Sequence, residues 1–151
     1  MNQDELKLTG KVHMVLTDAA GNIKKEVTSN NLVVTAGKAF VTSALITAPS
    51  AYMTRVAIGT SSSATAVGQT DLQGTELARV VATTSNPTSV TTLLSASFGA
   101  GVGTGTIEEA GIFNATAAGP ASGTMFSRYL TGTFTKGALD TLTVSWTITT
   151  T

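Results

Sequence analysis

The sequence has no cysteine and few charged residues, and each shortage excludes a class of function. Without cysteine the chain can form no disulfide, zinc–thiolate site or thiol nucleophile. Asp, Glu, Lys and Arg make up 12% of the 151 residues, about half the usual share, and the net charge is zero. Proteins that bind nucleic acid carry a basic patch, whereas the only basic doublet here is Lys24-Lys25. We therefore expect no nucleic-acid partner.

Long hydrophobic runs are also missing. The most apolar stretch, residues 32–53, is interrupted by Lys38, Pro49 and several hydroxyl residues, so it does not suit a membrane span. Residues 1–7 are polar, and no apolar segment follows them, so we expect no targeting signal. The length suits one domain. We predict a flexible arm over residues 1–7, a single β-sandwich domain over residues 8–151, and no contact with a membrane.

The composition itself points toward an assembly. Hydrophobic residues make up 42% of the chain, and threonine is abundant where charge is scarce. Free monomers usually depend on net charge for solubility, so a surface of this kind is easier to explain if partners cover much of it. The simpler alternative is a β-rich domain, because threonine favours strands.

Short stretches of alternating apolar and polar residues, separated by turn signals, predict a mainly β chain. In the clearest of them, residues 140–149, an apolar face alternates with Ser and Thr, and that face consists of Leu142, Val144, Trp146 and Ile148. Such stretches recur roughly every ten residues, eight or nine in all. This pattern predicts an antiparallel β-sandwich, jelly-roll-like, with one short helix.

The helix is expected over residues 35–46. Thr35 is a suitable N-cap, apolar residues follow at helical spacing, and Pro49 ends the segment. Further along, Asn86-Pro87 is predicted to be a turn between two strands, over residues 75–84 and 90–98.

The most informative stretch is residues 106–114, which is predicted to be a central strand with two acids among apolar residues. Strict alternation places Glu109 on the same face as Ile107 and Phe113, the face expected to be the core. A carboxylate buried there needs a cation. We expect Arg79 to be that partner, with Arg128 as the second choice.

We interpret this group as a structural ion-pair cluster formed by Glu109, Arg79, Glu76 and Arg128. A glycosidase needs two carboxylates aimed at one cleft, but Glu108 and Glu109 are neighbours on a strand and point to opposite faces. The remaining enzyme hypothesis would use Glu109 with Glu76. We expect no enzymatic activity and no catalytic residue.

Other chemistry is poorly supported by the residues present. His13, the only histidine, is predicted to lie on the surface, and no Gly-x-Ser-x-Gly elbow surrounds any serine. The glycine-rich residues 99–105 precede a strand and lack the spacing of a phosphate loop. Asp18, Asp71 and Asp140 are isolated, which gives calcium no clustered ligands. We therefore expect no cofactor and no metal.

The aromatic residues raise the possibility of a stacking platform for sugars or bases. The candidates are Trp146, Phe113, Phe126 and Phe134. Trp146 alternates with leucine and valine, so core packing is the preferred interpretation.

Six stretches taken together resemble small virion structural proteins of tailed bacteriophages. They cover residues 31–38, 57–60, 75–79, 107–114, 123–128 and 140–148. Their order also resembles a module of phage tail-collar and tail-fibre proteins, in which a glycine-containing strand precedes Leu-x-x-Glu-x-x-Arg and Glu-x-Gly-Leu-Phe. The resemblance implies a β-sandwich that builds part of a virion and implies no activity.

Within that group, a compact domain with low charge is most similar to a capsid decoration, or cement, protein. The resemblance implies a homo-oligomer, a dimer or trimer, that binds the major capsid protein on the virion surface. Candidate contact regions are the arm 1–7 and the loops 60–70 and 115–123. The alternatives are a tail, collar or baseplate adaptor, or a carbohydrate-binding module at a fibre tip.

Overall fold

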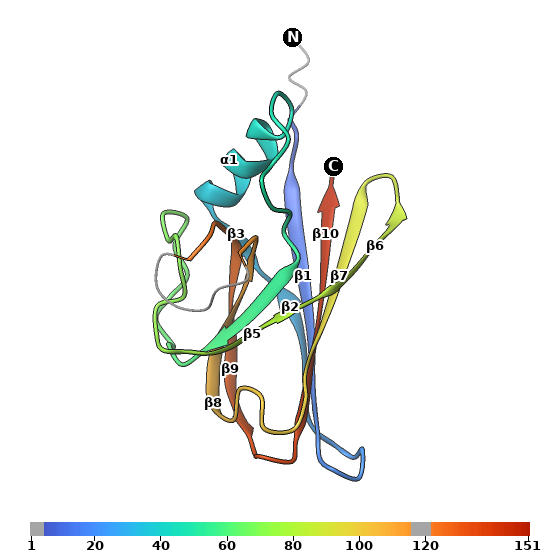
Figure 1. The fold of residues 1–151 in the computed structure, drawn as a ribbon, viewed down its shortest axis with the longest axis vertical. Helices are drawn as coiled ribbons and strands as arrows, with labels where there is room; N and C mark the ends of the chain where they lie inside the picture. The colour runs from blue at the N-terminus through green and yellow to red at the C-terminus, as the bar shows by residue number, and fades with distance from the viewer. Residues whose placement is uncertain (1–4, 116–121) are drawn as a thin grey trace.

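The computed structural model of this chain describes residues 5–115 and 122–151. Within them, two five-stranded antiparallel sheets form a sandwich, with the single helix at one end (Figure 1). This confirms the predicted fold class. The elements are β1 Leu8–Thr17, β2 Ile23–Asn30, β3 Leu32–Val33, α1 Thr35–Ser43, β4 Arg55–Gly59, β5 Glu76–Val81, β6 Thr83–Thr88, β7 Thr91–Phe98, β8 Gly105–Phe113, β9 Met125–Lys136 and β10 Thr141–Thr150.

Sheet A has the strand order β2-β1-β10-β7-β6. Its centre is the antiparallel pair of β1 and β10, which runs from Leu8 opposite Thr150 to Thr17 opposite Thr141. The predicted alternation of β10 is confirmed, because Leu142, Val144 and Trp146 are fully buried in the core while the residues between them are half-buried on the outer face. The first residues of β1 and the last residues of β10 lie at the same end of the sandwich as α1 (Figure 1).

Sheet B has the order β3-β9-β8-β4-β5. The main core lies between the sheets and joins residues of β1, β7 and β10 to residues of β4, β8 and β9. A second, smaller apolar cluster lies on the outer face of sheet B and consists of Val34, Ala57, Leu72, Phe113 and Met125. Both faces of sheet B are therefore covered by other residues. For this reason polar side chains on its outer face can also be buried.

The helix differs from its prediction at both ends. Thr35 is not the N-cap; Val34 is, because its backbone stays extended and its amide donates to the carbonyl of Phe126. The helix ends at Ser43, and turns continue to residue 46. The only fully buried helical residue is Gly37, where an added Cβ would lie 2.1 Å from the Phe126 carbonyl oxygen, so the helix approaches β9 through its backbone. This helix is neither long nor apolar enough to cross a membrane.

Two strand predictions also need correction. The segment 75–84 is divided between sheets, because the chain crosses from β5 in sheet B to β6 in sheet A at the buried Ala82. Asn86-Pro87 lies within β6 and is not a turn. A proline is tolerated there because β6 is an edge strand and its register with β7 shifts at this point. With β3, the division gives ten strands in the described chain rather than eight or nine.

The predicted arm meets the sandwich at the start of β1. Lys7 and Thr151 exchange two backbone hydrogen bonds, of 2.7 and 2.9 Å, which extend the pairing of β1 with the C-terminal strand by one step. Residues 5–7 are exposed, and residues 1–4 lie outside the described part of the chain.

Candidate functional site

The outer face of sheet B collects the four residues predicted to form ion pairs, and an irregularity in β8 decides which residues join them. Opposite Glu108 the partner strand carries residues 131–133, including Gly132 with φ of +60°, so the register shifts. Ile107 therefore packs in the main core, while Glu109 and Phe113 lie on the outer face. The prediction that Ile107 and Glu109 share a face is wrong, because the bulge interrupts the alternation.

The partner of Glu109 is Arg128. The Arg128 Nε atom lies 2.7 Å from Glu109 Oε2, and both side chains are completely buried. Our first choice, Arg79, is wrong, and the second is confirmed. The reason is strand order. Arg128 lies on β9, the neighbour of β8, directly opposite Gly111 and two residues along from Glu109, whereas Arg79 lies on β5, with β4 between it and β8.

The Glu109 carboxylate also holds the loop between β4 and β5. It accepts hydrogen bonds from the backbone amides of Ser61 at 3.1 Å, Gln73 at 2.9 Å and Gly74 at 2.8 Å. Gly59 lies opposite Glu109 on β4, and an added Cβ there would lie 2.8 Å from Glu109 Oε1. A glycine at this position therefore leaves room for the carboxylate to reach the loop.

Arg128 fastens the middle of the same loop. Its Nη1 atom donates to the Ser63 carbonyl at 2.9 Å and to Gln69 Oε1 at 3.1 Å. Much of the loop is exposed, as the sequence predicts, but its backbone is tied to the sheet at several points. One buried ion pair thus orders a segment that has no regular secondary structure of its own.

The second pair joins Arg79 to Glu76 within β5. Two parallel hydrogen bonds of 2.8 Å connect the guanidinium to the carboxylate, and the Arg79 side chain is fully buried. The guanidinium also lies 4.0 Å from the centre of the Phe113 ring and donates to the Ser122 carbonyl at 2.9 Å. This arginine therefore binds one end of the connection between β8 and β9, although most of the predicted contact loop, residues 116–121, lies outside the described residues.

All four predicted residues thus meet on one face, in two separate pairs. Strand register places Gly59 between the two acids, and it places Ala57 and Gly111 between the two arginines. Sequence reasoning did not predict that small residues separate the charged side chains. The signal was present, because Ala57, Gly59 and Gly111 all belong to the stretches 57–60 and 107–114 singled out above. The carboxylate oxygens accept hydrogen bonds from backbone amides and guanidinium groups. The two ion pairs therefore hold the neighbouring loops against sheet B.

The remaining charged candidates lie elsewhere. His13 lies on the outer face of sheet A with its side chain 43% exposed, which agrees with the predicted surface position, and its Nε2 atom lies 2.7 Å from Glu26 Oε1. Asp140 accepts hydrogen bonds from Lys24 at 2.6 Å and from the Gly137 amide at 2.7 Å, and these contacts hold the pKa of Asp140 below its usual value. In the described ranges no group of three His, Cys, Asp or Glu side chains could hold a metal ion.

The aromatic candidates for a stacking platform are buried. Trp146, Phe113 and Phe134 have no exposed surface, and Phe126 is 5% exposed. The prediction that Trp146 belongs to the core is confirmed. An exposed aromatic ring is instead provided by Tyr52, which lies in the segment between α1 and β4.

Comparison of the chain with protein-family models, with curated proteins and with solved structures finds no match. The resemblance to phage virion proteins therefore rests on the motifs alone and stays a prediction.

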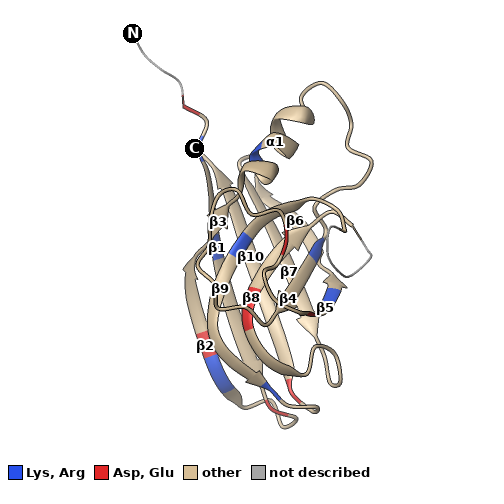
Figure 2. Ribbon diagram, turned by 90° about the vertical axis from the view of Figure 1, so that its left-hand side faces the viewer, with Lys and Arg blue, Asp and Glu red and all other residues tan. Residues whose placement is uncertain are grey.

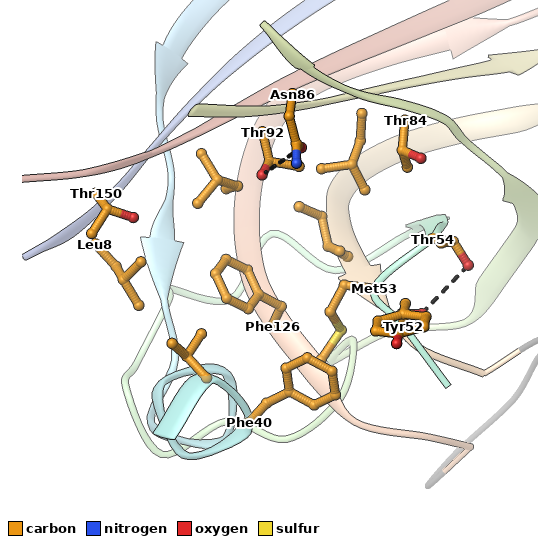
Figure 3. Close-up of a pocket in the computed structure, with 14 residues that line it drawn as sticks. Leu8, Phe40, Tyr52, Met53, Thr54, Thr84, Asn86, Thr92, Phe126 and Thr150 are labelled. Atoms are coloured by element: carbon orange, nitrogen blue, oxygen red, sulfur yellow. Dashed lines mark hydrogen bonds between the residues drawn. The ribbon is translucent and has the colours of Figure 1, made fainter. Parts of the chain in front are cut away.

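The clearest cavity lies at the helix end of the sandwich, between the two sheets. It has a volume of about 400 Å³, and Figure 3 shows side chains from α1, the segment before β4 and β9 converging on it. Its walls are mainly apolar, and they include Phe40, Met53, Leu94, Ile112, Phe126 and Ile148. Hydroxyl and amide groups form part of its lining, among them Asn86 and Thr92, which are hydrogen bonded at 3.2 Å.

Proposed function

We propose that this protein is a structural component of the virion of a tailed bacteriophage, a capsid decoration protein that binds the outside of the major capsid shell. The motifs spread over residues 31–149 support this partner, and the β-sandwich agrees with the fold that the resemblance implies. The interaction is non-covalent, and the protein acts as a clamp between neighbouring capsid subunits.

The observation that carries the proposal is the outer face of sheet A. The strand β10 presents only hydroxyl side chains to this face: Thr141, Thr143, Ser145, Thr147 and Thr149. In the middle of the sheet, Ser145 lies between His13 on β1 and Ser95 on β7, and Thr83 follows on β6. None of the strands β10, β7 and β6 carries a charged residue; Figure 2 colours the charged residues on the ribbon.

Such a face suits a broad protein partner. Covering a charged group requires removal of its hydration, which is costly unless a counter-charge is supplied, whereas hydroxyl groups can exchange water for hydrogen bonds of similar strength. The part of this face formed by β10, β7 and β6 can therefore be covered by many partly polar contacts, whereas Lys11 and Glu26 place charges on its β1–β2 side. When several linked copies make such contacts at once with a symmetric shell, the contacts together bind much more tightly than any one of them.

The ion pairs on the outer face of sheet B support the same role. A clamp must keep its shape under load, and the two buried ion pairs fasten the long loops to the sandwich. The acids and arginines that could otherwise take part in chemistry are used for this purpose. The loop 60–70 and the exposed residues 5–7 remain candidate contacts beside the hydroxyl face.

Binding to capsids that lack this protein tests the proposal. We expect the purified chain to sediment with such capsids and to reach a copy number close to that of the major capsid protein. Thr143→Glu, which places a charge on the hydroxyl face between Val15 on β1 and Ser97 on β7, should weaken binding at least about tenfold. Ala19→Glu, in the exposed β1–β2 turn, is the matched control and should bind normally. Failure of the parent protein to bind would refute the proposal.

The copy number also separates the nearest alternative, a tail, collar or baseplate adaptor. A decoration protein is present at a ratio to the major capsid protein near one, or a simple fraction of it. A handful of copies per particle would assign the chain to the tail or neck instead.

A further inference from the structure

Exposed apolar side chains gather beside the cavity at the helix end of the sandwich. Leu45 is 80% exposed, Ile46 is 90% exposed and Tyr52 is 66% exposed, and all three belong to the short segment between α1 and β4. No charged residue occurs from Ala39 to Thr54. We call Leu45, Ile46 and Tyr52 the apical patch. The segment that carries it leaves α1 at the upper end of the fold in Figure 1.

The apical patch is continuous with the cavity. Tyr52 lines the cavity, and so does Val41 on α1. Leu45 follows Val41 by four residues, and helical turns continue to Ile46 through the hydrogen bonds from the Leu45 amide to Thr42 and from the Ile46 amide to Ser43. Residues four apart lie on the same side of a helical turn. Leu45 and Tyr52 therefore lie beside the apolar hollow, and Ile46 follows Leu45 directly in the chain.

We propose that a second copy of this chain covers the apical patch, with the Leu45–Ile46 turn of each copy filling the cavity of its partner. In a two-fold dimer the same surface of both copies must be self-complementary. A projection next to a hollow meets this condition, because one rotation inserts both projections at once. The result is a closed dimer. This inference concerns self-association alone and does not depend on binding to a capsid.

The size of the surface agrees with a dimer of modest affinity. Burying a large aliphatic or aromatic side chain removes roughly 100–200 Å² from water, so the three residues of the apical patch contribute at most roughly 300–600 Å² per copy. The largest apolar patch of an ordinary soluble monomer has about this size and is often functional. A standard interface buries about 800 Å² per partner, and the hydroxyl and amide groups along the cavity can supply the rest as a polar rim. The absence of charge from Ala39 to Thr54 means that no ion there must lose its hydration.

The competing arrangement is head-to-tail stacking. At the opposite end of the sandwich Leu139, in the β9–β10 turn, is 70% exposed, and Val102 in the β7–β8 loop is 40% exposed. Insertion of these side chains into the cavity of another copy would give an open chain of molecules, because the two contacting surfaces differ. A substitution at Ile46 should affect the two-fold dimer, and it should affect head-to-tail stacking only if position 46 lies in that contact, whereas a substitution at Leu139 should affect head-to-tail stacking alone.

Sedimentation velocity over protein concentrations from about 1 μM to 1 mM measures the association. We expect a monomer–dimer equilibrium in the parent chain. Ile46→Asp should raise the dissociation constant at least about 100-fold, because each dimer would bury two unpaired carboxylates. Leu139→Asp is the matched control, with a similarly exposed side chain at the other end, and should leave the constant unchanged. Thermal unfolding followed by circular dichroism checks that both variants remain folded.

Disulfide trapping provides the second test, since the chain has no cysteine of its own. An oxidised equal mixture of Ile46→Cys and Asn86→Cys copies should form a linked heterodimer, because Asn86 lines the cavity. A mixture of Leu139→Cys and Asn86→Cys copies should not. A parent chain that stays monomeric throughout, a dimer insensitive to Ile46→Asp, or preferential linking through position 139 would each overturn the proposal.

Discussion

Replacing Glu109 with alanine removes the group on which most of the β4–β5 loop depends. In the folded protein its carboxylate accepts from Arg128 and from the backbone amides of Ser61, Gln73 and Gly74. After the substitution the Arg128 guanidinium stays buried without a counter-charge. Its Nη1 atom keeps two acceptors, and its Nη2 atom already has none among the described residues.

The expected loss can be worked from these contacts. Breaking a buried ion pair by removing one partner costs about 3–5 kcal/mol. Three orphaned amides would add about 1–3 kcal/mol each if they stayed buried. Gln73 is exposed and Ser61 and Gly74 are half-buried, so the loop can open and hydrate them at little further cost. We therefore expect Glu109→Ala to lower the free energy of unfolding by about 3–5 kcal/mol, a large part of the stability of an ordinary domain.

Urea unfolding at neutral pH, with linear extrapolation to water, measures this loss. The matched control is Glu108→Ala, because this neighbouring acid accepts an exposed hydrogen bond of 2.8 Å from the Thr133 hydroxyl, and its loss should cost less than about 1 kcal/mol. If Glu109→Ala leaves too little folded protein, Glu109→Gln retains an acceptor and gives a measurable transition. A double variant, Glu109→Leu with Arg128→Met, should regain part of the loss, since no unpaired charge remains. A loss below about 1 kcal/mol for Glu109→Ala would refute the reasoning.

Three further changes test other parts of the structure. Gly59→Ala places a Cβ 2.8 Å from the Glu109 carboxylate and should cost about 1–3 kcal/mol in urea unfolding; a neutral result would mean that the carboxylate can move aside. Arg79→Lys keeps the charge but loses the paired hydrogen bonds to Glu76 and the flat contact with Phe113, so we expect about 1–2 kcal/mol in the same assay and no gain in stability. Because the pKa of Asp140 is lowered in the folded state, its contribution is present above its unfolded pKa of about 3.9 and is lost as pH falls through the folded pKa. The difference in melting temperature between the parent and Asp140→Asn should therefore shrink when pH is lowered below about 4, and a constant difference would contradict this assignment.

Local sequence patterns determined much of this protein. Alternation in β10 predicts the buried face of Leu142, Val144 and Trp146, because a strand with one packed face must repeat every two residues. The same reasoning correctly predicts the sandwich, a surface His13 and a Glu109 that is buried and paired with an arginine. These features depend on neighbours along the chain and on the cost of burying a charge.

Only the tertiary structure decided which arginine meets Glu109, because that choice depends on the order of strands in sheet B and on a bulge opposite Glu108. It also decided that the segment 75–84 serves both sheets, and that Leu45 at the end of α1 projects from the fold instead of packing into it. Strand order and sheet crossing arise from contacts between residues far apart in the chain, and local periodicity carries no information about them. The sequence by itself thus determined which side chains must be buried or paired, and the packing of the two sheets decided with which partners.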